Sequence, residues 1–356
     1  MITFHCTQSE RILAHLITFG SRGRVVHPFF MDTGMERPLD PCCLKSRYDR
    51  IPRLLKSANY HVSDKVCLLH SLVEIYAPTR LYELCQTLFG VFATDCPFWG
   101  VCDTFLCDSP NCRRELHVIL MDDILIETAD QMARQLYDLV TITSPSDLAF
   151  RKATNAEKER ARRMLTNLAF LTRSEPSIGN LPRTDQFPDF WITETLCNAL
   201  AFLVAHETTH LGKQKSIDTY RLHIPGALEI ARQNNIQLGE YQTIGWAKEL
   251  DADVDALMIM STDRLCAHLD EAMREGTYRC VTAGAALALK AWDLLMLERC
   301  YGKPQYQKMT ADGHPPARAR IAHVLRSART LSDLHAVAGD DLWAIRIIDA
   351  LEDLHL

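Results

Sequence analysis

Hydrophobic and polar positions change their spacing along this chain of 356 residues. In its first third, two short apolar runs end in acidic residues and predict buried strands over residues 24–32 (RVVHPFFMD) and 115–123 (ELHVILMDD). Between them, residues 65–76 and 79–92 carry apolar side chains at helical spacing and predict two helices. The N-terminal part is therefore expected to mix strands and helices.

From Asp122 onward, the helical period dominates. Helices are predicted over four stretches: residues 123–140, 155–173, 193–211 and 246–263. The first is expected to bury a face made of Ile126, Ala129, Met132, Ala133 and Leu136. The third offers Leu196, Leu200, Leu203 and Val204 to a core. The pattern as a whole predicts a mainly helical α+β protein.

One segment interrupts the helical pattern. Residues 174–190 (SEPSIGNLPRTDQFPDF) contain three prolines and predict a loop or linker. This places a mixed α/β region at 1–173 and a second region at 191–356.

Composition narrows the class of protein. A hydrophobic fraction of 47% and a charged fraction of 24% are ordinary for a soluble globular protein, and a net charge of -6 argues against a general nucleic-acid binder. The N-terminus lacks the pattern of a signal peptide. The longest apolar stretch, residues 281–298, is interrupted by Lys290 and Asp293, so no membrane span is predicted. Thirteen scattered cysteines then favour free thiols in the reducing cytoplasm.

The stretch FLVAHETTHLGK, residues 202–213, holds two histidines on one helix face. His206 and His210 are four residues apart, so their imidazoles project side by side and suit a divalent metal ion. Glu207 is offset around the helix, where it can reach a metal-bound water. The alternative is a buried helix with two hydrogen-bonded histidines.

A third ligand is needed for a catalytic zinc, and KELDADVDA supplies a candidate. Glu249 and Asp253 are again four residues apart on a predicted helix. If Glu249 binds the metal, Asp253 can accept a hydrogen bond from a ligand imidazole and fix its tautomer. The alternative is a solvated acidic helix face.

A further histidine precedes two prolines in TADGHPPARARI, residues 310–321. Pro315 and Pro316 stiffen the backbone beside His314 and hold it extended. A histidine fixed near a zinc site can donate a hydrogen bond to a developing oxyanion.

These three segments, in this order, resemble the gluzincin metallopeptidases of the HtpX and CAAX-prenyl-processing type (HExxH, ExxAD, HPPxxxRI). The matching residues are His206, Glu207, His210, Glu249, Ala252, Asp253, His314, Pro315, Pro316, Arg320 and Ile321. The resemblance spans about residues 190 to 325, and the chain is more loosely similar to phage-exclusion peptidases of the Lit type.

The resemblance implies a zincin-like catalytic region with a small sheet and an active-site helix carrying HExxH. His206, His210 and Glu249 would bind one zinc ion, and Glu207 would be the general base. Asp253 would support the ligands, paired with Arg320, and His314 would stabilise the transition state. The function implied is that of a soluble endopeptidase acting on a protein or peptide.

The ligand types leave iron, manganese and cobalt open beside zinc. The alternative function is a non-proteolytic metal-containing binding or sensor protein. For the peptidase, the N-terminal region is a candidate for partner recognition or autoinhibition, with residues 115–123 as an edge strand for an extended peptide. The oligomeric state stays open.

A second metal site is also conceivable in the cysteine-rich segment 95–115. Four thiols are close in sequence there: Cys96, Cys102, Cys107 and Cys112. They could surround a structural zinc ion, although the usual pairs of C-x-x-C are absent. The alternative is scattered free or buried thiols.

Overall fold

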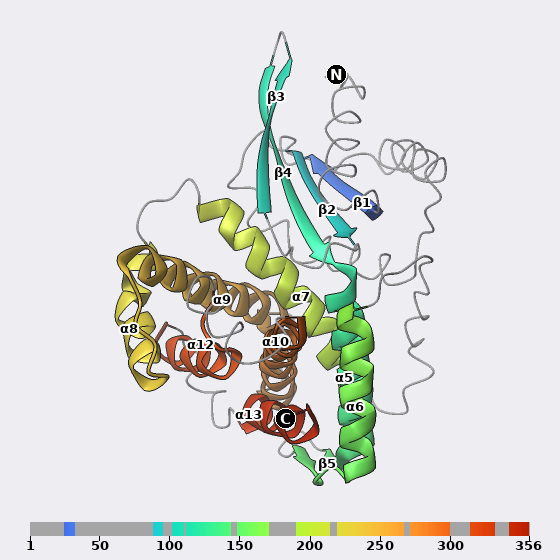
Figure 1. Cartoon of the computed structure of the whole chain (residues 1–356). Helices are drawn as coiled ribbons and strands as arrows, with labels where there is room; N and C mark the ends of the chain where they lie inside the picture. The colour runs from blue at the N-terminus through green and yellow to red at the C-terminus, as the bar shows by residue number, and fades with distance from the viewer. Residues whose placement is uncertain are drawn as a thin grey trace. The chain divides into compact units, whose positions relative to one another are not determined.

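The computed structural model describes residues 25–32, 88–94, 102–109, 112–143, 148–170, 190–213, 219–266, 271–299, 314–331 and 342–355 (Figure 1). By its contacts, the chain divides into two compact units, Met1–Ile126 with Ser174–Leu181 and Glu127–Arg173 with Pro182–Leu356. This division differs from the boundary at residue 173 that the sequence suggests. Residues 127–173 group with the C-terminal unit because α6 (Asn155–Phe170) packs against α10 (Glu271–Arg299) and α13 (Leu342–His355).

The first unit contains a sheet of four described strands in the order β1-β2-β4-β3. The strands are β1 Val25–Asp32, β2 Leu88–Thr94, β3 Cys102–Ser109 and β4 Cys112–Asp122. β2 and β4 are parallel, and the other two pairs are antiparallel. Both strands predicted from the sequence are present as β1 and β4.

Two expectations for this unit are wrong. Residues 88–92 were predicted as part of a helix, but they form β2, because a short apolar run fits either period and here finds partners in both β1 and β4. β4 is not an edge strand, since Leu116–Ile119 pairs with β2 on one side and β3 on the other. It therefore has no open edge there for a peptide, and the edges among the described strands are β1 and β3. Residues 65–76 lie outside the described part of the chain.

The second unit is built mainly from helices. They are α5 Asp123–Leu139, whose first turn falls in the first unit, α6, α7 Phe190–Lys213, the 3-10 helix η3 Thr219–His223, α8 Ile224–Gln233, α9 Glu240–Cys266, α10, α12 Ala317–Leu331 and α13. A short hairpin of β5 (Val140–Thr143) and β6 (Leu148–Phe150) follows α5. The described residues thus have a mainly helical α+β fold, as predicted.

The core of this unit surrounds α10, which contacts α6, α7, α9, α12 and α13 (Figure 1). Tyr278–Arg299 is long and apolar enough to cross a membrane, but 78% of its most apolar window is buried inside the structure, as in the core helix of a soluble protein. The predicted core residues Ala129, Met132, Ala133, Leu136, Leu196, Leu200 and Val204 are buried. Leu203 is half-buried, and the side chain of Ile126 lies outside the described residues.

The crossing of α7 and α10 depends on one glycine. A Cβ added at Gly284 would lie 2.4 Å from Asn198 Cβ and 2.7 Å from the Ala199 backbone nitrogen. Both distances are too short for any side chain, so the two helix backbones can approach this closely only with glycine at this position. This contact sets the place of α7, which carries the HExxH motif.

Candidate metal centre

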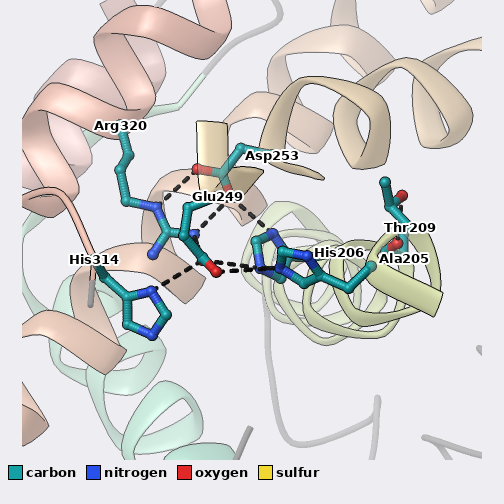
Figure 2. Close-up of polar contacts among 8 residues, drawn as sticks. Ala205, His206, Thr209, Glu249, Asp253, His314 and Arg320 are labelled. Atoms are coloured by element: carbon teal, nitrogen blue, oxygen red, sulfur yellow. Dashed lines mark hydrogen bonds and ion pairs between the residues drawn. The ribbon is translucent and has the colours of Figure 1, made fainter. Parts of the chain in front are cut away.

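The two histidines of HExxH lie side by side on the C-terminal half of α7. Their Nε2 atoms are 3.0 Å apart, and the two rings are almost perpendicular, at 84°. His206 is buried, whereas His210 is half-buried. Thr209, between them, donates its hydroxyl hydrogen bond to the Ala205 carbonyl at 3.0 Å, so its buried hydroxyl is satisfied within the helix (Figure 2).

α9 supplies the third group of the site. This helix buries Trp246 and Leu250 in a cluster with α8. On the same helix, Glu249 Oε2 lies 3.3 Å from His206 Nε2 (Figure 2). Its other oxygen, Oε1, lies 3.3 Å from His210 Nε2. Within the described part of the chain, these three residues form the one group whose potential ligand atoms lie within 4.8 Å of one another.

The separations between these donor atoms fit a tetrahedral metal. Metal–ligand bonds of the usual zinc lengths place two ligand atoms about 3.3 to 3.4 Å apart. The three measured separations, 3.0, 3.3 and 3.3 Å, are close to that value. Two imidazoles and one carboxylate are also the ligand types of a catalytic zinc site. The residues therefore fit a divalent metal ion.

Asp253 and Arg320 contact two of these three residues. Arg320, on α12, donates two hydrogen bonds to Asp253, Nε to Oδ2 at 2.7 Å and Nη2 to Oδ1 at 2.8 Å. Its Nη2 also approaches Glu249 Oε2 at 3.3 Å. Asp253 is fully buried, so this two-point contact supplies the cation that offsets its desolvation (Figure 2).

Asp253 also faces the first histidine. Its Oδ1 lies 2.9 Å from His206 Nδ1, the distance of a hydrogen bond, although the ring nitrogen lacks a well-aligned partner. A carboxylate on Nδ1 favours the tautomer that leaves Nε2 available to a metal. Asp253 and Arg320 together therefore connect His206 with Glu249.

The charges around the site favour a bound cation. Burial lowers the pKa of His206, but the Asp253 and Glu249 carboxylates outweigh burial and raise it to about 10. Burial raises the pKa of the Glu249 carboxyl, but His314, His210 and His206 outweigh this and hold it well below its ordinary value. Surroundings that favour a proton on His206 and a charge on Glu249 also favour a metal ion between them.

The pKa of Glu207 is shifted in the opposite direction to that of Glu249. Burial raises its pKa, and the positive charges of His206, His210 and His314 oppose that rise. The side chain remains partly exposed. A carboxylate whose pKa moves towards neutrality, close to the ligand histidines, is suited to accept and release a proton.

His314 lies three residues before Ala317, the first residue of α12. Its Nδ1 is 3.1 Å from Glu249 Oε2, without the alignment of a good hydrogen bond, and its side chain is 36% exposed (Figure 2). The ring also packs edge-to-face on Trp292 of α10, with centroids 4.7 Å apart. The following residue, Pro315, is buried.

The structure thus brings together residues from three helices of the second unit, α7, α9 and α12, and from the segment before α12: His206, Glu207, His210, Glu249, Asp253, Arg320 and His314. Trp292 is a neighbour that the sequence did not indicate, because it lies inside an apolar run without a motif. Of the four cysteines considered for a second metal, Cys96 lies outside the described residues. Cys102, Cys107 and Cys112 lie in β3 and β4, where only the backbone is described, so that site stays a prediction.

No family model matches this chain, and no curated protein or solved structure is significantly similar to it. The resemblance to gluzincin peptidases therefore depends on the three motifs and on the site they form.

Proposed function

We propose that this protein is a soluble, cytoplasmic, zinc-dependent endopeptidase that hydrolyses peptide bonds of a protein substrate. The observation that carries the proposal is the convergence of His206, His210 and Glu249 at metal-ligand separations. Glu207, in the motif position of the general base, lies within electrostatic reach of all three. A zincin-like arrangement of the catalytic region is part of the same proposal.

His206, His210 and Glu249 would hold one zinc ion per chain. When bound, zinc lowers the pKa of a coordinated water towards 7 and polarises a carbonyl group. Arg320 and Asp253 would keep two of these residues oriented. Arg320 contacts Glu249, Asp253 lies beside Nδ1 of His206, and Arg320 and Asp253 are hydrogen-bonded to each other.

Glu207 accepts the proton of the attacking water while the water oxygen bonds to the carbonyl carbon of the substrate. When the carbon–nitrogen bond breaks, Glu207 returns that proton to the leaving amine. His314 donates a hydrogen bond to the carbonyl oxygen as negative charge develops there. Its partial exposure leaves the ring accessible to a substrate.

The alternative, a metal-containing binding or sensor protein, needs the same three ligands but no base. The presence of Glu207 beside the ligands, with its pKa raised by burial, favours catalysis. The two functions predict different behaviour of one variant, Glu207→Gln.

The test incubates zinc-loaded protein with a cell lysate and identifies new protein N-termini by mass spectrometry. Wild type is expected to create new N-termini, whereas Glu207→Gln should create at least about 100-fold fewer while it still binds zinc. Glu240→Gln, an exposed glutamate at the start of α9, is the matched control and should behave as wild type. The same N-termini with wild type and Glu207→Gln would exclude the peptidase function and favour the sensor.

A further inference from the structure

The apolar helix α10 carries an unexpected polar group in its core-facing part. Lys290 and Asp293 are 4% and 9% exposed, one turn apart. Burying a charged pair costs free energy that an apolar pair would not. These two residues interrupt the longest apolar stretch of the sequence. Their contacts explain why the helix carries charges in its buried part.

Lys290 and Asp293 link α10 to the two helices that follow it. Lys290 Nζ lies 3.4 Å from Asp293 Oδ2 and donates a hydrogen bond to Glu352 of α13 at 2.9 Å. Arg318 of α12 also donates to Glu352, at 3.1 Å. One turn of α10 is thus fastened to α13 and, through Glu352, to the first turn of α12.

Asp293 also acts on the start of α12. The backbone N–H of Ala317, the first residue of α12, favours the charged form of Asp293, although burial raises the pKa of this carboxyl. No acidic side chain of α12 itself lies in its first turn, so Asp293 supplies the negative charge that a helix N-terminus prefers. This contact joins α10 to the start of α12, three residues after His314.

Trp292, the residue before Asp293, contacts His314 directly. Its ring packs on the His314 ring at 4.7 Å and 81°. Such edge-to-face contacts are directional, so they restrict the rotation of the imidazole. The two following prolines restrict the backbone of His314, and Trp292 packs on its ring.

We propose that Trp292 is a positioning residue that sets the orientation of the His314 imidazole at the metal centre. It does not touch the reacting atoms and acts through His314. The catalytic consequence rests on the proposed peptidase function, whereas the orientation of the ring does not.

The first arm of the test measures orientation without activity. Histidine-labelled protein is examined by NMR, and the His314 signal is assigned by its loss in His314→Gln. Trp292→Leu is expected to change the nuclear Overhauser contacts of the His314 ring protons with neighbours other than residue 292, because His314 loses the ring that restricts its rotation. The contacts of the His206 and His210 rings should stay unchanged. Trp292→Phe should retain most of the wild-type contacts of His314. Leu297→Ala, another half-buried position of α10, is the control and should leave the contacts of all three rings unchanged.

The second arm is a double-mutant cycle on turnover. Trp292→Leu is expected to lower kcat about 10-fold to 100-fold with KM unchanged, because a misplaced donor is lost in the transition state. In a His314→Ala background the same substitution should have almost no further effect.

Unchanged contacts of the His314 ring in Trp292→Leu would overturn the proposal, as would an equal loss of kcat in both backgrounds. Changed His314 contacts in Trp292→Leu, with a wild type that cleaves nothing, would contradict the peptidase function alone and leave the positioning role supported. If Trp292→Leu does not fold, the comparison of Trp292→Phe with wild type decides. His314 contacts and kcat close to those of wild type would support the proposal, and unchanged contacts with a lowered kcat would overturn it.

Discussion

Two pairs of histidines lie at nearly the same separation in the second unit and have different surroundings. His206 and His210 approach at 3.0 Å, through Nε2 of each ring. His223 and His323 approach at 2.9 Å, through Nδ1 of one and Nε2 of the other. Distance and residue type alone would rank them equally as metal ligands.

The position of the carboxylates separates them. Glu249 reaches both nitrogens of the first pair, so three donor atoms surround one point. In the second pair, Asp251 lies 3.3 Å from His223 Nε2, the nitrogen that faces away from His323. The second set of groups is a chain, Asp251 to His223 to His323, with no common centre.

The pKa values follow this difference. His206 has its pKa raised to about 10 because two carboxylates outweigh burial. His323 has its pKa lowered to about 4 by burial, by the neighbouring His223 and by Arg326. The surroundings of His206 favour a positive charge and those of His323 oppose one, so we expect a metal at the first pair and a structural contact between the rings at the second.

Among the substitutions that test this difference, Arg320→Ala should have the largest effect. Arg320→Ala would leave the fully buried Asp253 without its two hydrogen bonds, and it should lower the free energy of unfolding by about 3 to 5 kcal/mol. Arg318→Ala, on the same helix but with a side chain 49% exposed, should cost less than about 1 kcal/mol. Urea unfolding of both variants measures the two values, and equal losses would contradict the importance of the buried pair.

The lowered pKa of His323 predicts that the free energy of unfolding depends on pH, with a slightly smaller effect. Its folded pKa of about 4 lies below the ordinary value, so between these values the unfolded chain takes up a proton that the folded protein does not. The free energy of unfolding should therefore fall as the pH drops from about 6.5 to 4, by about 3 kcal/mol for this residue.

His355, whose pKa is also lowered to about 4, contributes over the same pH range, so the comparison needs a variant. His323→Gln should show a smaller loss between pH 7 and pH 4.5 than wild type, by urea unfolding at both pH values. An identical loss in the two proteins would contradict the lowered pKa of the half-buried His323.

Two glycines give the smallest effects, with opposite signs. Gly284→Ala forces α7 and α10 apart and should lower the free energy of unfolding by about 1 to 3 kcal/mol, with weaker metal binding at the His206 pair. A Cβ added at Gly245, in the interior of α9, meets nothing within 4 Å. Gly245→Ala should therefore raise the free energy of unfolding by about 1 kcal/mol, because alanine has the higher helix propensity. Thermal and urea unfolding give the signs, and a neutral Gly284→Ala would exclude a tight crossing.

The sequence predicted the parts of this molecule that depend on local periodicity. The buried face of α5, the helix that carries His206 and His210, and the i, i+4 spacing of Glu249 and Asp253 all follow from the 3.6-residue period. The motif order also indicated that Arg320 would pair with Asp253, and the structure contains that pair.

Features that depend on distant partners were not accessible in this way. β2 was taken for helix, and β4 for an edge, because strand pairing is decided by segments far apart in the sequence. Trp292 had no motif to mark it, since its contact with His314 joins α10 to the segment before α12. The grouping of α6 with α10 and α13 likewise depends on packing across the chain.

The central claim is that the His206 pair, and not the His223 pair, binds a metal ion. The most direct measurement is the zinc content per chain, by elemental analysis after zinc loading and dialysis, of wild type, His206→Ala and His323→Ala. We predict one zinc ion in wild type, none in His206→Ala and one in His323→Ala. No zinc in wild type, or one retained in His206→Ala, would contradict the account.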